Sequence, residues 1–165
     1  MQAHHIDLFL ASPALSPKHI MQSPQSPTSS ASQSIKAEYK YSELTGRIIG
    51  CAMEVHNTLG NGFQEVIYQR ALAYELQLQN ISFNREYEMP VVYKDRTVGS
   101  RRVDFLIEDK ISVEIKALIQ LEAVHLAQAI NYLEAYNLEI GLLINFGNTK
   151  LAFHRIQNKK FKANV

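Results

Sequence analysis

Every second residue is apolar over residues 103–107 and again over residues 111–115. A period of two predicts two strands that each bury one face. The three residues between them, 108–110, are all charged and predict a tight turn, so we expect a β-hairpin. The polar face of this hairpin carries Arg102, Asp104, Glu114 and Lys116.

The length of the turn decides which polar side chains meet. A three-residue turn places Asp104 opposite Glu114 and Arg102 opposite Lys116, with the Cβ atoms of each pair about 5 Å apart. Like charges in opposite positions destabilise a sheet, so this face makes a poor solvated surface. A divalent metal ion between the two carboxylates would relieve the repulsion. A turn of two or four residues would instead put the carboxylates on opposite faces.

The other apolar patterns predict three helices and further strands. Helices are expected at about residues 41–59, 63–79 and 121–136. Strands are expected at residues 83–93, 97–107, 111–116, 139–146 and 150–156. Asn61 is expected to cap the second helix, with Gln64 as its capping-box partner. Pro90 predicts an edge or irregular position for the first strand.

This order of elements, α-α-β-β-β-α-β-β, predicts one α/β domain over residues 41–157, with a mixed sheet flanked by helices. Residues 140–144 are apolar on both faces, as expected for a central parallel strand. A helix separates this strand from the hairpin, which predicts a right-handed β-α-β crossover. The length of 165 residues suits a single domain with a substantial core.

Composition sets both ends of the chain apart from this domain. Residues 1–37 hold eight serines and four of the five prolines without apolar periodicity. Such a segment predicts a disordered leader, or alternatively an over-extended gene start. Residues 158–165 form a short basic tail, which is expected to be solvated or to touch a nucleic-acid backbone.

Composition also excludes several kinds of site. The net charge is +1, so bulk electrostatics give no argument for nucleic acid. The single cysteine, Cys51, excludes an intrachain disulfide, a cysteine-rich zinc site and a four-cysteine iron–sulfur cluster. No apolar run reaches membrane-spanning length, so we expect no membrane partner and a cytoplasmic location.

Polar residues on the helices are ambiguous when each is taken alone. Glu65, near the start of the second helix, would complement the helix dipole without any chemistry. His56 is better explained as a packed histidine at a helix end than as part of a site near residues 60–62. Gln128 and Tyr132 share one stripe of the third helix with His125, and they also fit the polar margin of an amphipathic helix.

Two ordered motifs change this interpretation. Residues 62–68 read G-x-x-E-x-x-Y, and the hairpin reads D-(x)9-E-x-K from Asp104 to Lys116. In these motifs the chain resembles the GxxExxY protein family, a branch of the PD-(D/E)XK nuclease superfamily. The resemblance runs from about residue 44 to residue 156 and implies a restriction-endonuclease-like core. Val103 stands where that superfamily can carry proline, at a position expected to point into the core.

The resemblance implies a metal-dependent phosphodiesterase site. Its expected catalytic residues are Glu65, Asp104, Glu114 and Lys116. Its expected metal ligands are Glu65, Asp104, Glu114 and the carbonyl of Ile115, and such oxygen ligands suit Mg²⁺ or Mn²⁺. The residues expected to bind substrate phosphate or water are Tyr68, Arg102, Gln128 and Tyr132. Lys116 is expected to act as a cation that positions the attacking water or stabilises charge on phosphorus.

Three functions compete at this stage. The favoured one is a nuclease acting on DNA or RNA. The second is a catalytically silent nucleic-acid-binding or regulatory protein with the same fold, since fold does not fix function. The third is a structural or partner-binding domain. A further hypothesis is a homo-oligomer formed through an exposed strand near Pro90 or through the last strand.

Overall fold

The computed structural model describes residues 40–163. Its helices and strands, in chain order, are α2 (Ser42–Leu59), α3 (Glu65–Leu78), β1 (Phe83–Tyr93), β2 (Arg96–Ile107), β3 (Ile111–Lys116), α4 (Ala123–Ala135), β4 (Ile140–Asn145) and β5 (Ala152–Gln157). This order confirms the one predicted from the apolar patterns. The leader expected at residues 1–37 and the last two residues of the tail lie outside the described residues.

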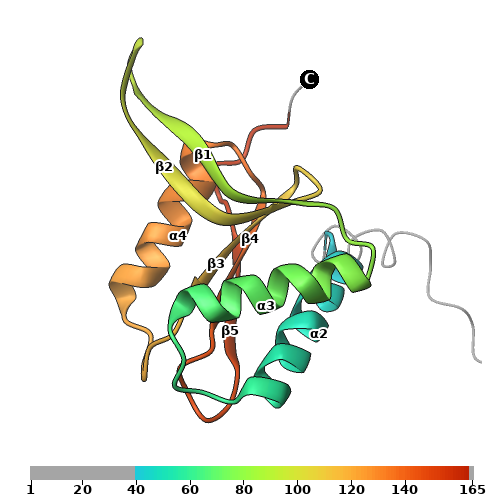
Figure 1. Cartoon of the computed structure of the whole chain (residues 1–165). Coiled ribbons are helices and arrows are strands. Elements are labelled where there is room, and N and C mark those ends of the chain that lie inside the picture. Colours follow the sequence, from blue (N-terminus) through green and yellow to red (C-terminus); the bar gives the residue numbers. More distant parts are fainter. Residues whose placement is uncertain (1–39, 164–165) are drawn as a thin grey trace, which may run out of the picture. The chain divides into compact units, whose positions relative to one another are not determined.

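The five strands form one mixed sheet in the order β1-β2-β3-β4-β5 (Figure 1). β3 and β4 are parallel, and the other neighbouring strands are antiparallel. Every residue of β4 is buried, as expected for a central strand. β1 lies at one edge of the sheet, which confirms the position predicted from Pro90.

Helices cover both faces of the sheet. α2 and α3 pack on one face, where Ile48 and Leu72 share a buried cluster with strand residues. α4 packs on the other face, where Leu133 contacts a second cluster. Leu142 belongs to the first cluster and Leu143 to the second, because successive side chains of a strand point to opposite faces. Among the described helices, none is both long and apolar enough to cross a membrane.

The loop between α2 and α3 differs from the prediction. α3 begins at Glu65, and Gln64, not Asn61, occupies the N-cap position without a side-chain hydrogen bond. Gly60 and Gly62 have positive φ values of 70° and 103°, which a right-handed helix does not accommodate. The expected cap by Asn61 is therefore wrong, and the helix starts two residues later than expected.

The β2–β3 hairpin confirms the three-residue turn after Ile107. The ladder between these strands stops after the pair Phe105 and Val113. The expected pairing of Arg102 with Lys116 is therefore wrong. Beyond this point β2 continues with β1 as a two-stranded ribbon, which projects from the rest of the sheet (Figure 1).

Asp104 lies at an irregular point of β2. Neither ladder includes it, and at the same level of β1 the unpaired Glu86 has a φ of 53°. Val103 packs with Met89 in a cluster beside α4, whereas Phe105 packs in the cluster of α2 and α3. The odd-numbered residues of β2 thus change face near Asp104. The expectation that they line one continuous apolar face is wrong.

His56 confirms the packed role that was expected for it. Its side chain is buried, and its Nε2 lies 2.9 Å from the carbonyl oxygen of Asn148. Its ring centroid lies 6.3 Å from that of Phe146. The histidine thus joins the end of α2 to the loop between β4 and β5.

The described part of the basic tail lies against the end of α4. Lys160 forms an ion pair with Glu134 at 2.8 Å. The amide of Asn137 donates to the carbonyl of Lys162 at 2.7 Å and accepts from its N–H at 2.9 Å. These contacts hold the tail in place by direct bonds to the domain.

Candidate active site

Asp104 is held by two donors at the point where β2 and β3 separate. The backbone N–H of Ile115 donates to its Oδ2 at 2.7 Å, and the amide of Gln69 donates to its Oδ1 at 2.9 Å. Gln69 is buried on α3, so the carboxylate is anchored from a strand and from a helix. Each carboxylate oxygen keeps a further lone pair for another partner.

Glu114 lies beside Asp104 and is buried, with a relative exposure of 9%. Burial, followed by the hydrogen bond and the charge of the Asp104 carboxyl, raises the pKa of Glu114 to about 8. Two carboxyl groups in such contact do not both ionise readily at neutral pH, so the pair retains a proton. A divalent cation in place of that proton would relieve the same repulsion.

Glu65 and Lys116 extend this cluster. The Nζ of Lys116 lies 3.9 Å from Oε1 of Glu65. Burial raises the pKa of Glu65, while the charge of Lys116 opposes that rise. The backbone of Ala117 also lowers the pKa of Glu65, so the first turn of α3 lies near the segment that follows β3.

The cluster suits a hard metal ion in its chemistry but is not closed around one. Within residues 40–163, no three His, Cys, Asp or Glu side chains converge as they would on a single ion. Asp104 and Glu114 form a pair, whereas Glu65 contacts Lys116 and Ala117. Carboxylate oxygens suit Mg²⁺ or Mn²⁺, so the pair fits such an ion. Glu65 would have to turn toward the pair to join it.

The carbonyl of Ile115 can supply a further oxygen ligand. The N–H and C=O of one strand residue point toward the same neighbouring strand. The N–H of Ile115 reaches Asp104 on the β2 side, whereas the carbonyl of Lys116 accepts the N–H of Phe146 on the β4 side at 2.8 Å. The carbonyl of Ile115 therefore points into the gap between β2 and β3, beside the carboxylate pair.

The residues expected to bind substrate do not all lie at this cluster. Tyr132 is close enough for the charge of Glu114 to contribute to its raised pKa, although burial is the larger cause. Gln128 lies one turn earlier on the same helix. Arg102 is exposed, and its guanidinium lies 3.9 Å from an acidic side chain of the ribbon. The structure therefore brings Tyr132 near the carboxylates and directs Arg102 elsewhere.

Tyr68 holds the loop between α2 and α3. Its side chain is fully buried and stacks on Phe146, with ring centroids 4.7 Å apart. Its hydroxyl donates to the carbonyl of Gly60 at 2.9 Å and accepts from the N–H of Phe63 at 3.2 Å. In this arrangement no surface of Tyr68 is open to a phosphate. The expected substrate contact is therefore replaced by a structural role, and Glu65 is the motif residue at the cluster.

Two residues at the site were not predicted, Gln69 and Arg101. Gln69 follows Glu65 by four positions on α3, and this spacing could have indicated a shared helix face. Arg101 donates from Nε to the hydroxyl of Tyr132 at 2.8 Å, and its guanidinium carbon lies 4.8 Å from the ring centroid. The regular alternation of β2 gave no signal for Arg101, because the change of face near Asp104 is what brings it to α4.

The backbone that follows β3 is fixed by contacts from the end of β4. The buried amide of Asn145 donates to the carbonyl of Leu118 at 2.8 Å and accepts from its N–H at 2.9 Å. A Cβ atom at Gly147 would lie closer than 3.0 Å to backbone atoms of Ala117 and Leu118. Glycine thus permits a close approach that positions the segment next to Lys116, the ion-pair partner of Glu65.

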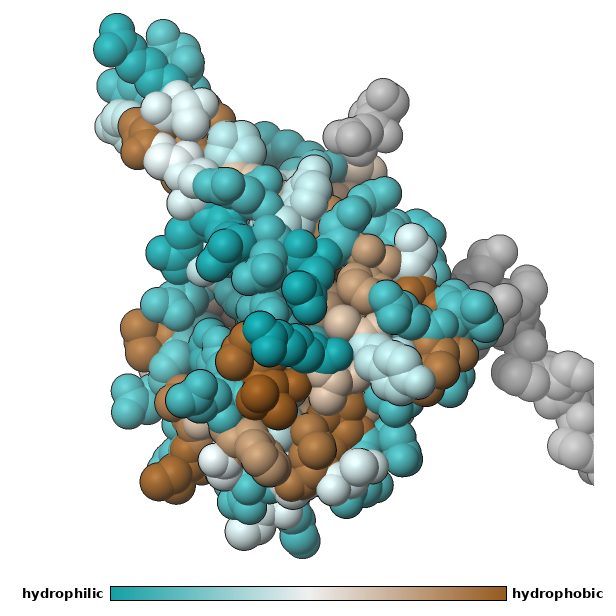
Figure 2. Space-filling model, in the orientation of Figure 1, coloured by the Kyte–Doolittle hydropathy of each residue, from teal (hydrophilic) through white to brown (hydrophobic). Residues whose placement is uncertain are grey.

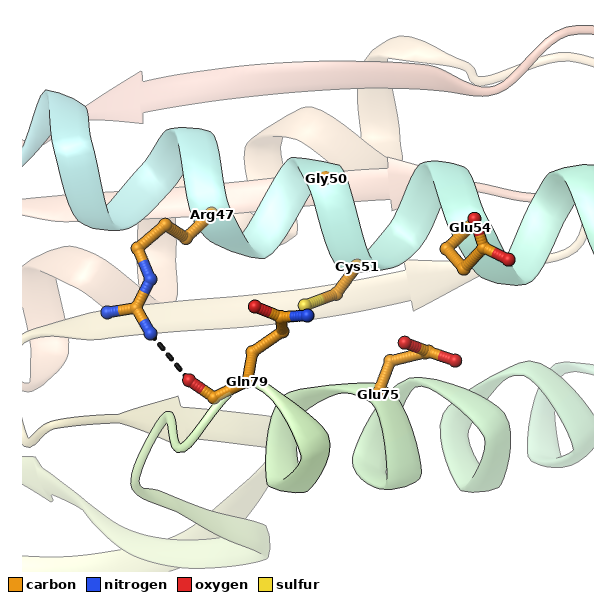
Figure 3. Close-up of a pocket in the computed structure, with 6 residues that line it drawn as sticks. All are labelled: Arg47, Gly50, Cys51, Glu54, Glu75 and Gln79. Carbon is orange, nitrogen blue, oxygen red and sulfur yellow. Dashed lines mark hydrogen bonds between the residues drawn. The ribbon is translucent and has the colours of Figure 1, made fainter.

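A separate cavity of about 530 Å³ lies between α2 and α3 (Figure 3). Its lining residues are Arg47, Gly50, Cys51, Glu54, Glu75 and Gln79. Arg47 reaches across and donates to the carbonyl of Gln79 at 2.6 Å, and burial raises the pKa of the Cys51 thiol. None of the residues expected at the active site lines this cavity.

Comparisons with known proteins were made at the level of families, curated proteins and solved structures. A family model described as "PD-(D/E)XK nuclease superfamily" matches residues 42–156. A comparison with curated proteins found no match. Among solved structures, the chain is similar to one described as "Crystal structure of SSO0001", with 19% sequence identity and a TM-score of 0.45. That match covers 75% of this chain and 61% of the other, so it spans less than two thirds of that protein's length.

Proposed function

The chain belongs to the PD-(D/E)XK nuclease superfamily, and we propose that it is a metal-dependent nuclease that hydrolyses phosphodiester bonds of DNA or RNA. The observation that supports this proposal is that Asp104, anchored by Ile115 and Gln69, lies close enough to the buried Glu114 to help raise its pKa. Bringing two carboxyl groups together in a buried position costs folding free energy. Binding a cation there would relieve that cost and would explain why the two carboxyl groups are placed together.

Each residue of the cluster has a proposed role in metal binding or in stabilising charge. Asp104, Glu114 and the carbonyl of Ile115 would hold Mg²⁺ or Mn²⁺, and Glu65 would complete the set after turning from Lys116. When bound, such an ion polarises a phosphodiester and lowers the pKa of its bound water. Lys116, no longer paired with Glu65, would stabilise the negative charge that develops on the phosphate oxygens.

Contacts to the substrate would come mainly from the side of α4. Tyr132 and Gln128 lie on this side, and Arg101 lies over the ring of Tyr132. An arginine can bind a phosphate through two parallel hydrogen bonds. Arg101, rather than the outward-facing Arg102, is therefore the arginine that we propose for a phosphate next to the scissile bond.

Three finer assignments accompany this function. The motif at residues 62–68 supports membership of the GxxExxY branch. The single cysteine, Cys51, fits a cytoplasmic location, where thiols stay reduced. A homo-oligomer would form through β1 or β5, because these strands are the two edges of the sheet.

The proposal is tested first by isothermal titration of Mn²⁺ into the wild-type chain and into Glu114→Ala. The Glu54→Gln variant is the control, since it removes an acid outside the cluster. Binding that is lost only in Glu114→Ala supports the carboxylate site. Cleavage of single- and double-stranded DNA and RNA in Mn²⁺, abolished by Asp104→Asn, then supports the nuclease.

The competing functions give different results in the same experiments. Salt-sensitive binding of nucleic acid without cleavage would favour the catalytically silent alternative. One observation favours the catalytically silent alternative: within residues 40–163, no three possible ligand side chains converge on a single position. If Mn²⁺ does not bind even with nucleic acid present, the metal-dependent function is refuted and a protein partner becomes the better hypothesis.

A further inference from the structure

A cleft lies next to the carboxylate cluster, between the β1–β2 ribbon and α4. It encloses about 330 Å³, with Val91 and Arg101 on the ribbon side and Gln128, Asn131, Tyr132 and Tyr136 on the α4 side. Arg101 and Tyr132 connect the cleft to the cluster, because Arg101 lies three residues before Asp104 on β2 and donates to the hydroxyl of Tyr132 at 2.8 Å. A ligand in this cleft would therefore sit beside the reacting phosphate of the proposed nuclease.

The walls of the cleft are fixed by their own hydrogen bonds. Arg101 donates to the hydroxyl of Tyr132, and its guanidinium lies over the same ring. The hydroxyl of Tyr136 donates to the carbonyl of Met89 at 3.0 Å, which ties the ribbon to α4. Both tyrosine hydroxyls are thus occupied by protein. Tyr132 is buried and lies beneath Arg101, so the exposed guanidinium of Arg101 is the flat group on which a planar ring can stack.

Two amide side chains in the cleft are free to bind a ligand. Gln128 and Asn131 lie three positions apart on α4, so they are neighbours on one face of the helix. Within residues 40–163 neither amide forms a side-chain hydrogen bond to the protein. An amide offers a donor and an acceptor side by side, which complements the edge of a nucleobase.

We propose that this cleft binds a nucleobase next to the scissile phosphate, by stacking on Arg101 and by hydrogen bonds from Gln128 and Asn131. This inference rests on the proposed function, because that function brings a nucleotide to the cleft. A base must leave its stack to enter such a pocket. The substrate class is therefore single-stranded nucleic acid or an unpaired segment of a duplex.

The test compares two probes that share a backbone. Fluorescent single-stranded oligonucleotides, of DNA and of RNA, are paired with versions that carry stable abasic analogues at every position. Dissociation constants are measured by fluorescence anisotropy in Mg²⁺ with the full chain carrying Asp104→Asn, which prevents cleavage and leaves the cleft unchanged. The same background then receives Arg101→Ala, Gln128→Ala and Asn131→Ala together, or Gln77→Ala, which removes an exposed helical amide outside the cleft.

In the Asp104→Asn background and with Gln77→Ala, the probe with bases binds about tenfold more tightly than the abasic one. With Arg101→Ala, Gln128→Ala and Asn131→Ala together, the difference falls to less than about twofold. Equal affinity for both probes in the background chain overturns the inference. Discrimination that survives the triple substitution also overturns it, as does binding of neither probe.

The result is independent of whether the chain is a nuclease. If cleavage depends on Asp104 but both probes bind with equal affinity, the nuclease function is supported and the base-binding cleft is refuted. Base discrimination without cleavage in the wild-type chain supports the cleft and refutes the nuclease. If the cleft instead binds a peptide or a small metabolite, affinity for the oligonucleotides does not depend on their bases.

Discussion

Asp104 reaches its position in the cluster through contacts from three elements. β2 carries it, the backbone of Ile115 on β3 fixes one oxygen, and Gln69 on α3 fixes the other. The meeting of β2 with β3 could be predicted, because a short turn between two alternating strands sets their register. The contact of Gln69 could not, since it depends on where α3 docks on the sheet.

Removing the amide of Gln69 tests whether it positions the metal ligand. The variant Gln69→Leu keeps a side chain of similar size but loses the donor to Asp104. We expect the affinity for Mn²⁺ to fall by about 10–100-fold, as for other residues that orient metal ligands. Isothermal titration measures this, with Gln77→Leu on the exposed side of α3 as the control. An unchanged affinity in Gln69→Leu would show that Asp104 needs no such support.

The carboxyl of Glu114 makes stability depend on pH in the metal-free protein. Its pKa is about 8 in the fold against a usual value of 4.5, so the folded state holds a proton that the unfolded chain releases. The free energy of unfolding should therefore fall as pH rises from about 4.5 to about 8, by at most about 5 kcal/mol. Urea denaturation in EDTA at several pH values measures this decrease.

The variant Glu114→Gln isolates this contribution. An amide has no acidic proton to lose and can still donate a hydrogen bond to Asp104. We expect Glu114→Gln to be more stable than the wild-type chain above pH 8, with little difference near pH 4.5. Stability curves that run parallel for the two proteins would contradict the shared proton.

At the scale of elements, features that arise from local patterns could be predicted from the sequence, whereas features that arise from long-range contacts could not. Strand and helix periodicities arise within each segment, and they predicted the order of all eight described elements. The irregular point of β2 near Asp104 escaped prediction, because it arises where β3 stops pairing and α4 takes over the packing of Val103. The same irregularity opens the gap in which the carboxylate pair lies.

The close approach between Gly147 and the backbone after β3 makes a prediction at this scale. A methyl group in Gly147→Ala would collide with the backbone of Ala117 and Leu118, so this segment must move. We expect a loss of about 1–3 kcal/mol in the free energy of unfolding. Mn²⁺ affinity should also fall, because the displaced segment is next to Lys116, the ion-pair partner of Glu65.

The control for this prediction is Gly50→Ala in α2. A Cβ atom there meets nothing within 4 Å, and alanine favours a helix over glycine by about 1 kcal/mol. Urea denaturation should therefore show Gly50→Ala to be as stable as the wild-type chain or more stable. Equal stability of Gly147→Ala and the wild-type chain would mean that the segment after β3 adapts freely.

At the scale of the whole molecule, helices pack on both faces of the sheet, and the candidate site takes residues from both sides, with Gln69 on α3 bonded to Asp104 and Tyr132 on α4 bonded to Arg101. α2 and α3 bury one face through the larger cluster. α4 packs on the other face. Figure 2, seen from the side on which α3 lies in front, shows hydrophilic side chains across much of the face in view, with hydrophobic ones mainly in its lower half. The alternation of strands and helices predicted this layered arrangement. The cleft under the ribbon could not be predicted, because it depends on the angle at which the ribbon leaves the sheet.

Stability of the whole fold should respond to the cation that the cluster is proposed to bind. An ion that binds only the folded chain stabilises it by about 2.7 kcal/mol at a concentration one hundred times its Kd. Because the ion replaces the proton on Glu114, we expect Mg²⁺ to raise the Tm more at pH 8 than at pH 6. Thermal unfolding with Mg²⁺ and with EDTA at both pH values measures the difference. A similar rise in Tm in Glu114→Gln would mean that the ion stabilises the fold from another site, since that variant has lost the charge for which ion and proton compete.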